Sequence, residues 1–255
     1  MYPFLNILGL KIPMYGVMTA LGYAAAIWYC LKRRHILGLS KDQVLDVIFY
    51  LIIGAAIGGK LFFIIFYWQD FAASVGLDKI RYGFVFLGGF VGACVAGVYI
   101  LRRMNIPLFR AADFFVQAVP LGHAIGKIGC FLAGCCYGKI SHVHALSVKF
   151  TDPHCLVPQH LHGVGLYPVQ LIESAISFCL FLVLYKLSNM KHKAGTILAA
   201  YMIGFGIIRF TAEFFRGEDE IYILGITQNQ ITALALVAIA IIFILWRDKI
   251  YARPK

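Results

Sequence analysis

The chain has 255 residues, of which 61% are hydrophobic and only 14% are charged. An average soluble domain is about 45–50% apolar and about 25% charged, so the composition excludes a disordered chain, a collagen-like rod, a small secreted disulfide domain and an ordinary soluble enzyme. Its net charge is +11, with 23 Lys and Arg against 12 Asp and Glu, which in a soluble protein would indicate nucleic-acid binding. The apolar content instead indicates an integral membrane protein.

Seven apolar stretches approach the length of about 20 residues that a helix needs to cross a bilayer. The first lacks a basic leader and a small-residue cleavage site, so we interpret it as a mature helix and not as a signal peptide. We expect an all-α polytopic membrane protein, with residues 1–255 forming one integral-membrane domain and an outer loop at about 137–167. The predicted spans are roughly Met14–Leu31, Val44–Tyr67, Phe84–Leu101, Ala111–Phe131, Pro168–Leu187, Gly195–Phe215 and Gln230–Trp246.

The basic residues of the connecting segments predict the orientation. One set of connections carries fourteen Lys and Arg and the opposite set carries six, while Lys60, Lys127 and Arg209 fall within or at the ends of spans. Because cytoplasmic loops collect Lys and Arg, we expect an N terminus outside and a C terminus in the cytoplasm. The excess positive charge then reflects topology, and we expect no nucleic-acid partner.

Ionisable residues inside the spans are the first indication of function, since each costs about 2.5–3.5 kcal/mol at membrane depth. Two of them, Lys60 and Asp113, lie near span edges, where snorkelling or a structural pair explains them equally well. The others indicate a functional site. The full set is Lys60, Asp113, His123, Lys127, Glu173, Arg209 and Glu213.

Two pairs of these residues are spaced four apart, so each pair shares one helix face. Arg209 and Glu213 form either a structural ion pair or a site in which the guanidinium holds a phosphate. His123 and Lys127 lie in a glycine-rich segment, which indicates either close helix packing or a backbone that approaches a ligand. For Glu173, a hydrogen bond with Gln170 is the simplest expectation. The glycines of the segment are Gly122, Gly126, Gly129 and Gly134.

Seven cysteines and an outer loop rich in histidine raise the question of a disulfide or a metal ion. A disulfide from Cys155 to either Cys135 or Cys136 is possible, and the sequence leaves the pairing open. The spacing of the loop residues matches none of the usual zinc patterns, so we expect no metal ion and no cofactor. The remaining cysteines are Cys30, Cys94, Cys130 and Cys179, and the loop histidines are His142, His144, His154, His160 and His162.

Several ordered motifs make the chain resemble the prolipoprotein diacylglyceryl transferases, polytopic bacterial enzymes of about seven membrane helices. The segment from Gly126 to Gly138 is similar to the family's Gly-Arg-x-Gly-Asn-Phe-x-Asn signature. The other matching motifs are Met14-Tyr15-Gly16-Val17-Met18, Gly58-Gly59-Lys60, Leu87-Gly88-Gly89, Ala112-Asp113-Phe114, Pro120-Leu121-Gly122, Pro168-Val169-Gln170-Leu171-Ile172-Glu173, Phe205-Gly206-Ile207-Ile208-Arg209-Phe210 with Glu213-Phe214-Phe215-Arg216, and Asn229-Gln230.

The chain also departs from the family pattern. The family's His before the paired glycines is Leu87 here, its signature Arg is Lys127, and its Asn three residues later is Cys130. An acidic residue of the signature is replaced by Cys135, and a Tyr of the late motif by Phe205. Because Leu87 cannot accept a proton, we expect His123 to act as the base, or Cys135 or Cys136 to act as a nucleophile.

The resemblance implies transfer of the diacylglyceryl group from phosphatidylglycerol to the lipobox cysteine thiol of prolipoproteins, the first step of lipoprotein maturation. Its implied partners are phosphatidylglycerol, prolipoprotein signal peptides and membrane lipids, and we expect a multi-pass monomer in the bacterial cytoplasmic (inner) membrane. The alternatives are a same-fold enzyme with another acceptor and a non-catalytic lipid-binding relative. The predicted catalytic residues are Arg209, Glu213, Lys127, His123 and Tyr15, and the predicted phosphatidylglycerol-binding residues are Lys127, Arg209, Gly138, Gly126, Gly129, Lys60 and Glu173.

Overall fold

The computed structural model describes residues 2–7, 9–73, 83–217, 222–223 and 225–251. The chain forms two compact units, one made of Met1–Tyr29 with Ala112–Lys255 and the other of Cys30–Ala111. The expectation of one domain over residues 1–255 stays a prediction.

Helices dominate the chain, as the apolar stretches predict. Six helical stretches are long and apolar enough to cross a membrane, and they coincide with six of the seven predicted spans. The helices are α1 (Met14–Arg33), α2 (Lys41–Phe66), α3 (Trp68–Ala73), α5 (Phe86–Arg103), α6 (Leu108–Val116), α7 (Ala118–Ala133), α8 (Val169–Ser188), α9 (Thr196–Glu213) and α10 (Gln228–Tyr251).

The third predicted span is the exception. It forms α5, an 18-residue helix that is not among the six stretches. Its length equals that of α9, which is among the six, and Arg102 and Arg103 occupy its last turn. The count of seven spans therefore stays a prediction.

The fourth predicted span is divided into α6 and α7 at Gln117. Pro120 lies in the first turn of α7, where its missing N–H costs no helical hydrogen bond. The Tyr29 hydroxyl donates to Gln117 Oε1 at 2.7 Å, and Gln117 Nε2 donates to the Asp113 carbonyl at 2.8 Å. These bonds hold the polar side chain at the junction inside the protein.

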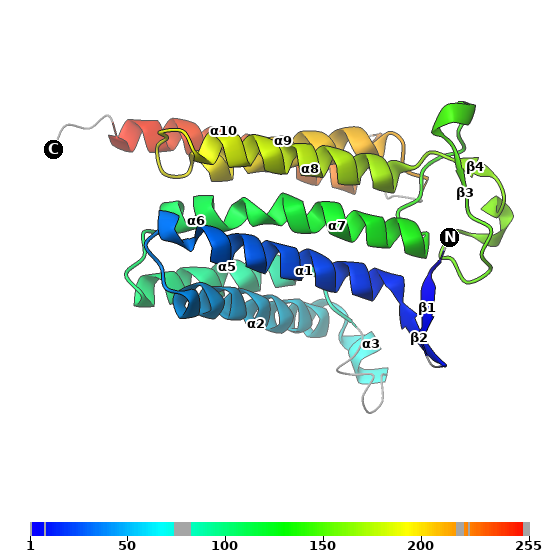
Figure 1. Ribbon diagram of the computed structural model, residues 1–255, viewed down its shortest axis with the longest axis horizontal. Coiled ribbons are helices and arrows are strands. Elements are labelled where there is room, and N and C mark those ends of the chain that lie inside the picture. The colour runs from blue at the N-terminus through cyan, green and yellow to red at the C-terminus, as the bar shows by residue number, and fades with distance from the viewer. Residues whose placement is uncertain (1, 8, 74–82, 218–221, 224, 252–255) are drawn as a thin grey trace. The chain divides into compact units, whose positions relative to one another are not determined.

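Within the first unit, α7 packs closely against α1 and runs beside α8, and α9 lies between α8 and α10 (Figure 1). A methyl group added at Gly122 would lie 3.3 Å from the Gly22 carbonyl oxygen of α1, and one at Gly129 would lie 2.9 Å from Met18 Cβ. At Gly126 the same methyl would meet nothing within 4 Å. Close packing thus explains Gly122 and Gly129 but not Gly126.

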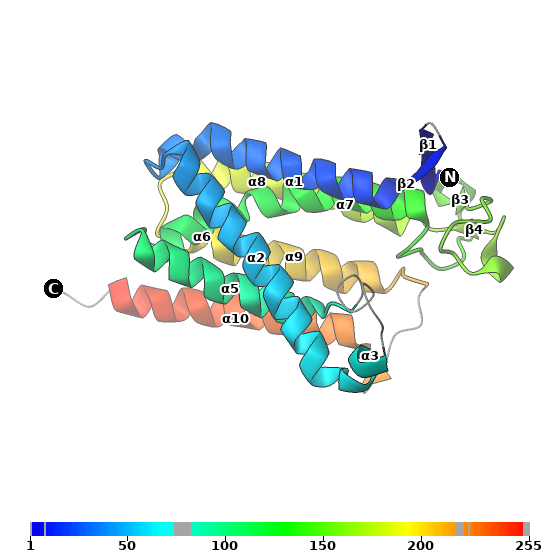
Figure 2. The ribbon, with the colours of Figure 1, turned by 90° about the horizontal axis from the view of Figure 1, so that it is seen from below.

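The second unit is built on backbone contact between α2 and α5, which cross at their glycines (Figure 2). A Cβ at Gly54 would lie 2.6 Å from the Gly92 carbonyl oxygen, and one at Gly58 would lie 2.8 Å from Gly92 Cα. Small residues allow helices to approach in this way inside a membrane. Glycine pairing therefore holds this unit together.

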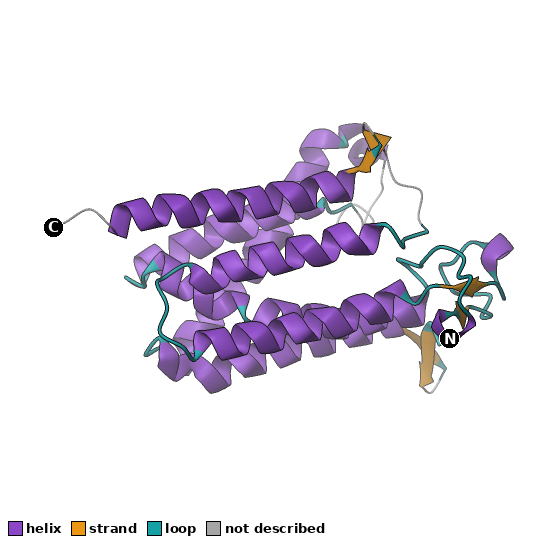
Figure 3. Ribbon diagram, turned by 90° about the horizontal axis from the view of Figure 1, so that it is seen from above, coloured by secondary structure: helices purple, strands orange, loops and turns teal. Residues whose placement is uncertain are grey.

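Short antiparallel strands lie at one end of the helices of the first unit, and helix dominates elsewhere (Figure 3). The N-terminal hairpin pairs Phe4 with Pro13 and leads directly into α1. The strands are β1 (Phe4–Ile7) with β2 (Leu10–Pro13), β3 (Val148–Lys149) with β4 (Gly165–Leu166), and β5 (Tyr222–Ile223) with β6 (Ile226–Thr227).

The predicted outer loop is ordered around a small core of its own. Phe150 and Leu166 are fully buried there, and Cys155 and Val157 are buried beside them. Phe131 at the end of α7 packs against this core, which fixes the loop to the helix. The loop is therefore an ordered part of the first unit.

The predicted orientation depends partly on basic residues outside the described ranges. Lys79, Arg81, Arg253 and Lys255 contribute to the two sets of basic residues, and all four lie outside the described residues. An outside N terminus and a cytoplasmic C terminus stay predictions.

Candidate functional site

A buried ion-pair network joins three helices of the first unit. Lys127 of α7 pairs with Glu173 Oε2 of α8. Arg209 of α9 lies with its Nη1 atom 3.6 Å from Glu173 Oε1. Glu173 therefore faces two cations on two neighbouring helices, instead of the hydrogen bond with Gln170 that the sequence suggests.

A second carboxylate extends the network along α9. Glu213 Oε2 lies 3.4 Å from Arg209 Nη2 and 3.8 Å from Arg216 Nε, and Glu213 Oε1 accepts a hydrogen bond from Asn229 Nδ2 at 3.2 Å. The predicted pairing of Arg209 with Glu213 is confirmed. Arg216 and Asn229 were not predicted as site residues. Arg216 could have been found from its spacing of three residues from Glu213, whereas only the fold places Asn229.

The charged side chains of this network are strongly buried. Lys127, Glu173 and Glu213 are 8%, 3% and 5% exposed, whereas the Arg209 side chain is 20% exposed. Among the described residues, three cationic side chains, those of Lys127, Arg209 and Arg216, face these two carboxylates. Buried charges are costly unless opposite charges or hydrogen bonds compensate them.

The network is held by ion pairs more than by short hydrogen bonds. Among the described residues, Glu173 Oε1 and Glu213 Oε2 are buried oxygen atoms that accept no hydrogen bond. Gln170 is fully buried one turn before Glu173, and its Nε2 atom donates to the Cys135 carbonyl at 2.9 Å while its Oε1 atom has no hydrogen-bond partner. Three buried oxygen atoms of the site can therefore accept a hydrogen bond from a ligand.

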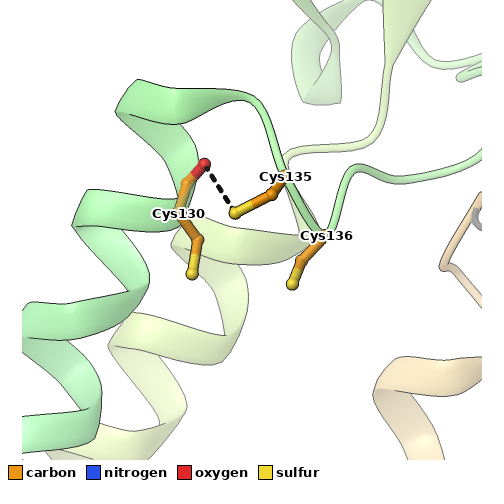
Figure 4. A group of neighbouring side chains, drawn as sticks. All are labelled: Cys130, Cys135 and Cys136. Atoms are coloured by element: carbon orange, nitrogen blue, oxygen red, sulfur yellow. Dashed lines mark hydrogen bonds between the residues drawn. The ribbon is translucent and has the colours of Figure 1, made fainter. Parts of the chain in front are cut away.

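Three thiols lie beside this network at the end of α7. Cys130 is in the last turn of the helix, Gly134 ends it with a φ of 82°, and Cys136 follows with a φ of 56°. The three Sγ atoms of Cys130, Cys135 and Cys136 lie within 4.8 Å of one another, and the Cys135 thiol faces the Cys130 carbonyl at 3.8 Å (Figure 4). We call these three residues the thiol cluster.

The pKa of Cys136 lies far below its ordinary value. Hydrogen bonds from the thiols of Cys130 and Cys135 are the main cause, and the positive charges of Lys127 and Arg216 add to it. The structure describes all seven cysteines and joins none of them in a disulfide, including Cys155. The thiol cluster is therefore electrostatically connected with the buried cations.

His123 lies one turn before Lys127 and is half-buried. Its ring contacts Phe205 with 5.4 Å between the centroids, and it interacts electrostatically with Lys127, Glu173 and Arg209. The structure thus brings His123 to the network, and its role as a base stays a prediction.

Tyr15 and Gly138 border the same region from two sides. Tyr15 is exposed at the start of α1, with its Cα 3.4 Å from a methyl group added at Gly129, and it interacts electrostatically with all three members of the thiol cluster. Gly138 forms a β-bridge with Arg216, and a methyl group there would lie 2.8 Å from Tyr167 Cβ. Close backbone packing alone accounts for Gly138.

Two predicted residues have other surroundings. Lys60 belongs to the second unit, where its Nζ atom lies 3.4 Å from the Gly83 carbonyl oxygen and 5.1 Å from the centre of the Phe63 ring. Asp113 lies at the opposite end of the first unit and accepts hydrogen bonds from the Gly195 and Leu198 N–H groups at 2.7 and 2.8 Å. Asp113 is a cap for α9, and the role of Lys60 stays a prediction.

Among the described residues, no histidine of the predicted outer loop belongs to a group of three or more potential metal ligands. Hydrogen bonds from His154 lower the pKa of Asp152, and His162 Nε2 lies 2.9 Å from the Val157 carbonyl oxygen and 3.4 Å from Cys155 Sγ. Among the described residues, the thiol cluster is the one group of three or more side chains with the geometry of a metal site.

Comparison with known proteins connects this geometry with a chemistry. A family model described as prolipoprotein diacylglyceryl transferase matches residues 3–246. A phosphatidylglycerol–prolipoprotein diacylglyceryl transferase of Clostridium tetani is 32% identical, over 92% of this chain and 93% of that protein. The protein of the same name from Geobacter sulfurreducens is 34% identical, over 82% of this chain and 80% of that protein. The protein of the same name from Proteus mirabilis is 29% identical, over 92% of this chain and 88% of that protein.

Proposed function

This chain belongs to the prolipoprotein diacylglyceryl transferase family, and we propose that its buried ion-pair network holds the phosphate of phosphatidylglycerol during transfer to a prolipoprotein thiol. The protein is a transferase of lipoprotein biosynthesis and has several membrane helices. The reaction joins the acceptor sulfur to the glyceryl carbon and releases glycerol phosphate. A site for it must stabilise a departing phosphate where water is scarce.

The position of Arg209 is the observation that supports this proposal most directly. Arg209 is the most exposed of its charged side chains and contacts its two carboxylates at 3.4 to 3.6 Å, so its guanidinium can turn toward a phosphate. A planar guanidinium binds two phosphate oxygens at once. Lys127 adds a second cation from the facing helix.

The other predicted residues have roles that follow from their positions. Glu173 and Glu213 hold the cations in place, because each carboxylate contacts two of them. Tyr15 provides a hydroxyl at the exposed edge, and His123 provides the base in place of the missing histidine at Leu87. The open space at Gly126 is where we expect the lipid to approach α7, while Gly129 and Gly138 serve packing.

Family membership also guides the proposal for the membrane arrangement. We include α5 as a seventh span, with the N terminus outside and the C terminus in the cytoplasm of a bacterial cell, so that the site faces away from the cytoplasm in the inner membrane. In this arrangement the protein is a multi-pass monomer, and its substrates are phosphatidylglycerol and prolipoprotein signal peptides. Cysteine-accessibility labelling of the two chain ends in intact cells tests it.

A transfer assay tests the proposed function. The purified chain is mixed with phosphatidylglycerol and a lipobox-cysteine peptide, and the peptide mass is measured. We expect the gain of one diacylglyceryl group, which Arg209→Ala abolishes and Lys149→Ala, at an exposed loop cation, leaves unchanged. Full turnover by Arg209→Ala would show that Arg209 does not hold the phosphate.

A second candidate function keeps the lipid donor and changes the acceptor. Leu87 and the thiol cluster distinguish this chain from the family pattern and favour that alternative. A folded chain that releases glycerol phosphate in a membrane extract but never modifies the peptide would support it, and peptide modification would exclude it.

A further inference from the structure

The proposed function leaves the thiol cluster without a role, although it adjoins the cations that would hold the phosphate. Its Sγ atoms lie within 4.8 Å of one another. In a four-coordinate zinc site with Zn–S bonds of about 2.3 Å, two thiolates lie about 3.8 Å apart. Small rotations of the side chains of Cys130, Cys135 and Cys136 therefore bring the sulfur atoms to zinc distance.

The charges around the thiol cluster suit an anionic metal complex. Three thiolates and one Zn²⁺ together carry one negative charge, and thiolates are the ligands that soft metal ions prefer. Lys127 lies one turn before Cys130 on α7, and Arg216 forms a β-bridge with Gly138, two residues after Cys136. Cationic side chains therefore lie close to the thiol cluster in the sequence and in the fold.

The spacing of Cys130, Cys135 and Cys136 in the sequence differs from the usual spacing of zinc ligands. The usual zinc patterns place two ligands on one short turn and two on another. Here Cys130 is on a helix, and the left-handed conformations of Gly134 and Cys136 turn the chain back so that Cys135 and Cys136 face it (Figure 4). Of the cysteines near the outer loop, Cys155 is buried in a separate core and takes no part.

The thiol cluster offers three ligands. All three cysteines are only half-buried, and catalytic zinc sites typically have three protein ligands and one exchangeable position. We propose that Cys130, Cys135 and Cys136 bind Zn²⁺ and that the open position of the ion takes the acceptor cysteine thiol. This inference rests on the proposed function for the identity of the acceptor.

His123, the proposed base, is the first proton acceptor in this step. The acceptor thiol replaces the water on Zn²⁺ and passes its proton through His123 to solvent, since a coordinating thiol is deprotonated outright. The bound sulfur then attacks the glyceryl carbon, so that a C–S bond forms and the C–O bond breaks with its electron pair on the phosphate oxygen of the leaving group. The thioether, a weaker ligand, is replaced by water, and the zinc ion stays Zn²⁺ throughout.

Cadmium binding tests the site without using activity. Cd²⁺ is added to the purified, reduced full chain in detergent, and the ultraviolet band of Cd–thiolate charge transfer is recorded. We expect one Cd²⁺ per chain, with the band lost or strongly reduced in C130S, C135S and C136S. The matched controls C94S and C179S, at exposed helix positions, should keep the band. A band that none of the three variants changes, or no band at all, would overturn the inference.

A peptide addition tests the open position. A lipobox-cysteine peptide should increase the charge-transfer band by one further thiolate, and the same peptide with serine should leave it unchanged. An unchanged band with the cysteine peptide would contradict the proposed role of the ion.

Removing the metal separates this inference from the proposed function. We expect transfer to fall at least tenfold after chelation and to return when Zn²⁺ is added. Full transfer by the metal-free chain and by C136S would overturn the zinc site and leave the proposed function intact. A chain that binds Cd²⁺ and the peptide thiol but never transfers lipid would support the site and contradict the proposed function.

Discussion

The two ends of the first helical unit satisfy their buried charges in different ways. At the end bordered by the strands, Glu173 pairs closely with Lys127, whereas Arg209 and Arg216 lie 3.4 to 3.8 Å from the carboxylates of Glu173 and Glu213. One oxygen of each carboxylate accepts no hydrogen bond among the described residues. At the other end, both oxygens of Asp113 accept backbone N–H groups at 2.7 and 2.8 Å. The carboxylates of the first end thus each keep one oxygen without a hydrogen bond, whereas Asp113 uses both of its oxygens.

Other polar side chains near Asp113 also form short hydrogen bonds. Close to Asp113, Arg247 Nη1 donates to Thr196 Oγ1 at 2.8 Å and lies 3.4 Å from the Ala194 carbonyl oxygen. Gln117 bridges a hydroxyl and a backbone carbonyl. Short hydrogen bonds fix the start of α9, whereas the longer ion pairs of Arg209 and Arg216 permit rearrangement around a ligand. The comparison supports the proposal that the end bordered by the strands binds the substrate.

The largest expected effect is on the stability of Glu173→Ala. Its removal leaves Lys127 and Arg209 buried with one carboxylate fewer, and breaking a buried pair typically costs about 3–5 kcal/mol. The unfolding midpoint in detergent should fall accordingly, together with loss of transfer.

A double substitution separates stability from function at this end. Lys127→Met combined with Glu173→Leu removes the pair and keeps side-chain volume, so we expect most of the lost stability to return while transfer stays absent. If the double variant were as unstable as Glu173→Ala, charge at this position would serve the fold, and the contrast between the two ends would fail.

The next effect is on turnover. Arg209→Lys keeps the charge but loses the planar fork that matches a phosphate, and loss of one donor to a developing anion typically costs about 10²–10³ in rate. We expect that loss in kcat/KM with an unchanged unfolding midpoint. Arg247→Lys at the other end is the control, and it should keep full turnover. Equal losses in the two variants would show that the contacts at the strand end have no special role in transfer.

A smaller effect is expected at the cap of α9. Asp113→Ala leaves the Gly195 and Leu198 N–H groups without their acceptor, and loss of a helix N-cap typically costs about 0.5–2 kcal/mol. The unfolding midpoint should fall, whereas kcat/KM of the folded fraction should stay unchanged. A loss of turnover at full stability would place Asp113 in the reaction and break the division between the ends.

Local spacing predicted much of this architecture, because apolar length and helical period are properties of short segments. Six of the seven expected spans coincide with membrane-length helices, and the pairing of Arg209 with Glu213 follows from their spacing of four residues. The family resemblance found from ordered motifs is likewise confirmed. The third predicted span, α5, is not among those helices.

The remaining features depend on contacts between distant segments, which spacing cannot specify. Glu173 meets Lys127 because α7 and α8 lie side by side, and Asp113 caps a helix that begins more than eighty residues later. The thiol cluster forms because one left-handed glycine, Gly134, reverses the chain after α7. In each case the sequence supplies the residue and the fold supplies its partner.

The smallest expected effect distinguishes two glycines of α7 that the sequence treats alike. A methyl at Gly126 meets nothing within 4 Å, so Gly126→Ala should stabilise the helix by up to about 1 kcal/mol. A methyl at Gly129 would lie 2.9 Å from Met18 Cβ, so Gly129→Ala should lower the unfolding midpoint. If the lipid approaches α7 at Gly126, that variant should also raise KM for phosphatidylglycerol severalfold at full stability. An unchanged KM would mean that the space at Gly126 is not used by the lipid, and the binding end would then consist of the ion-pair network alone.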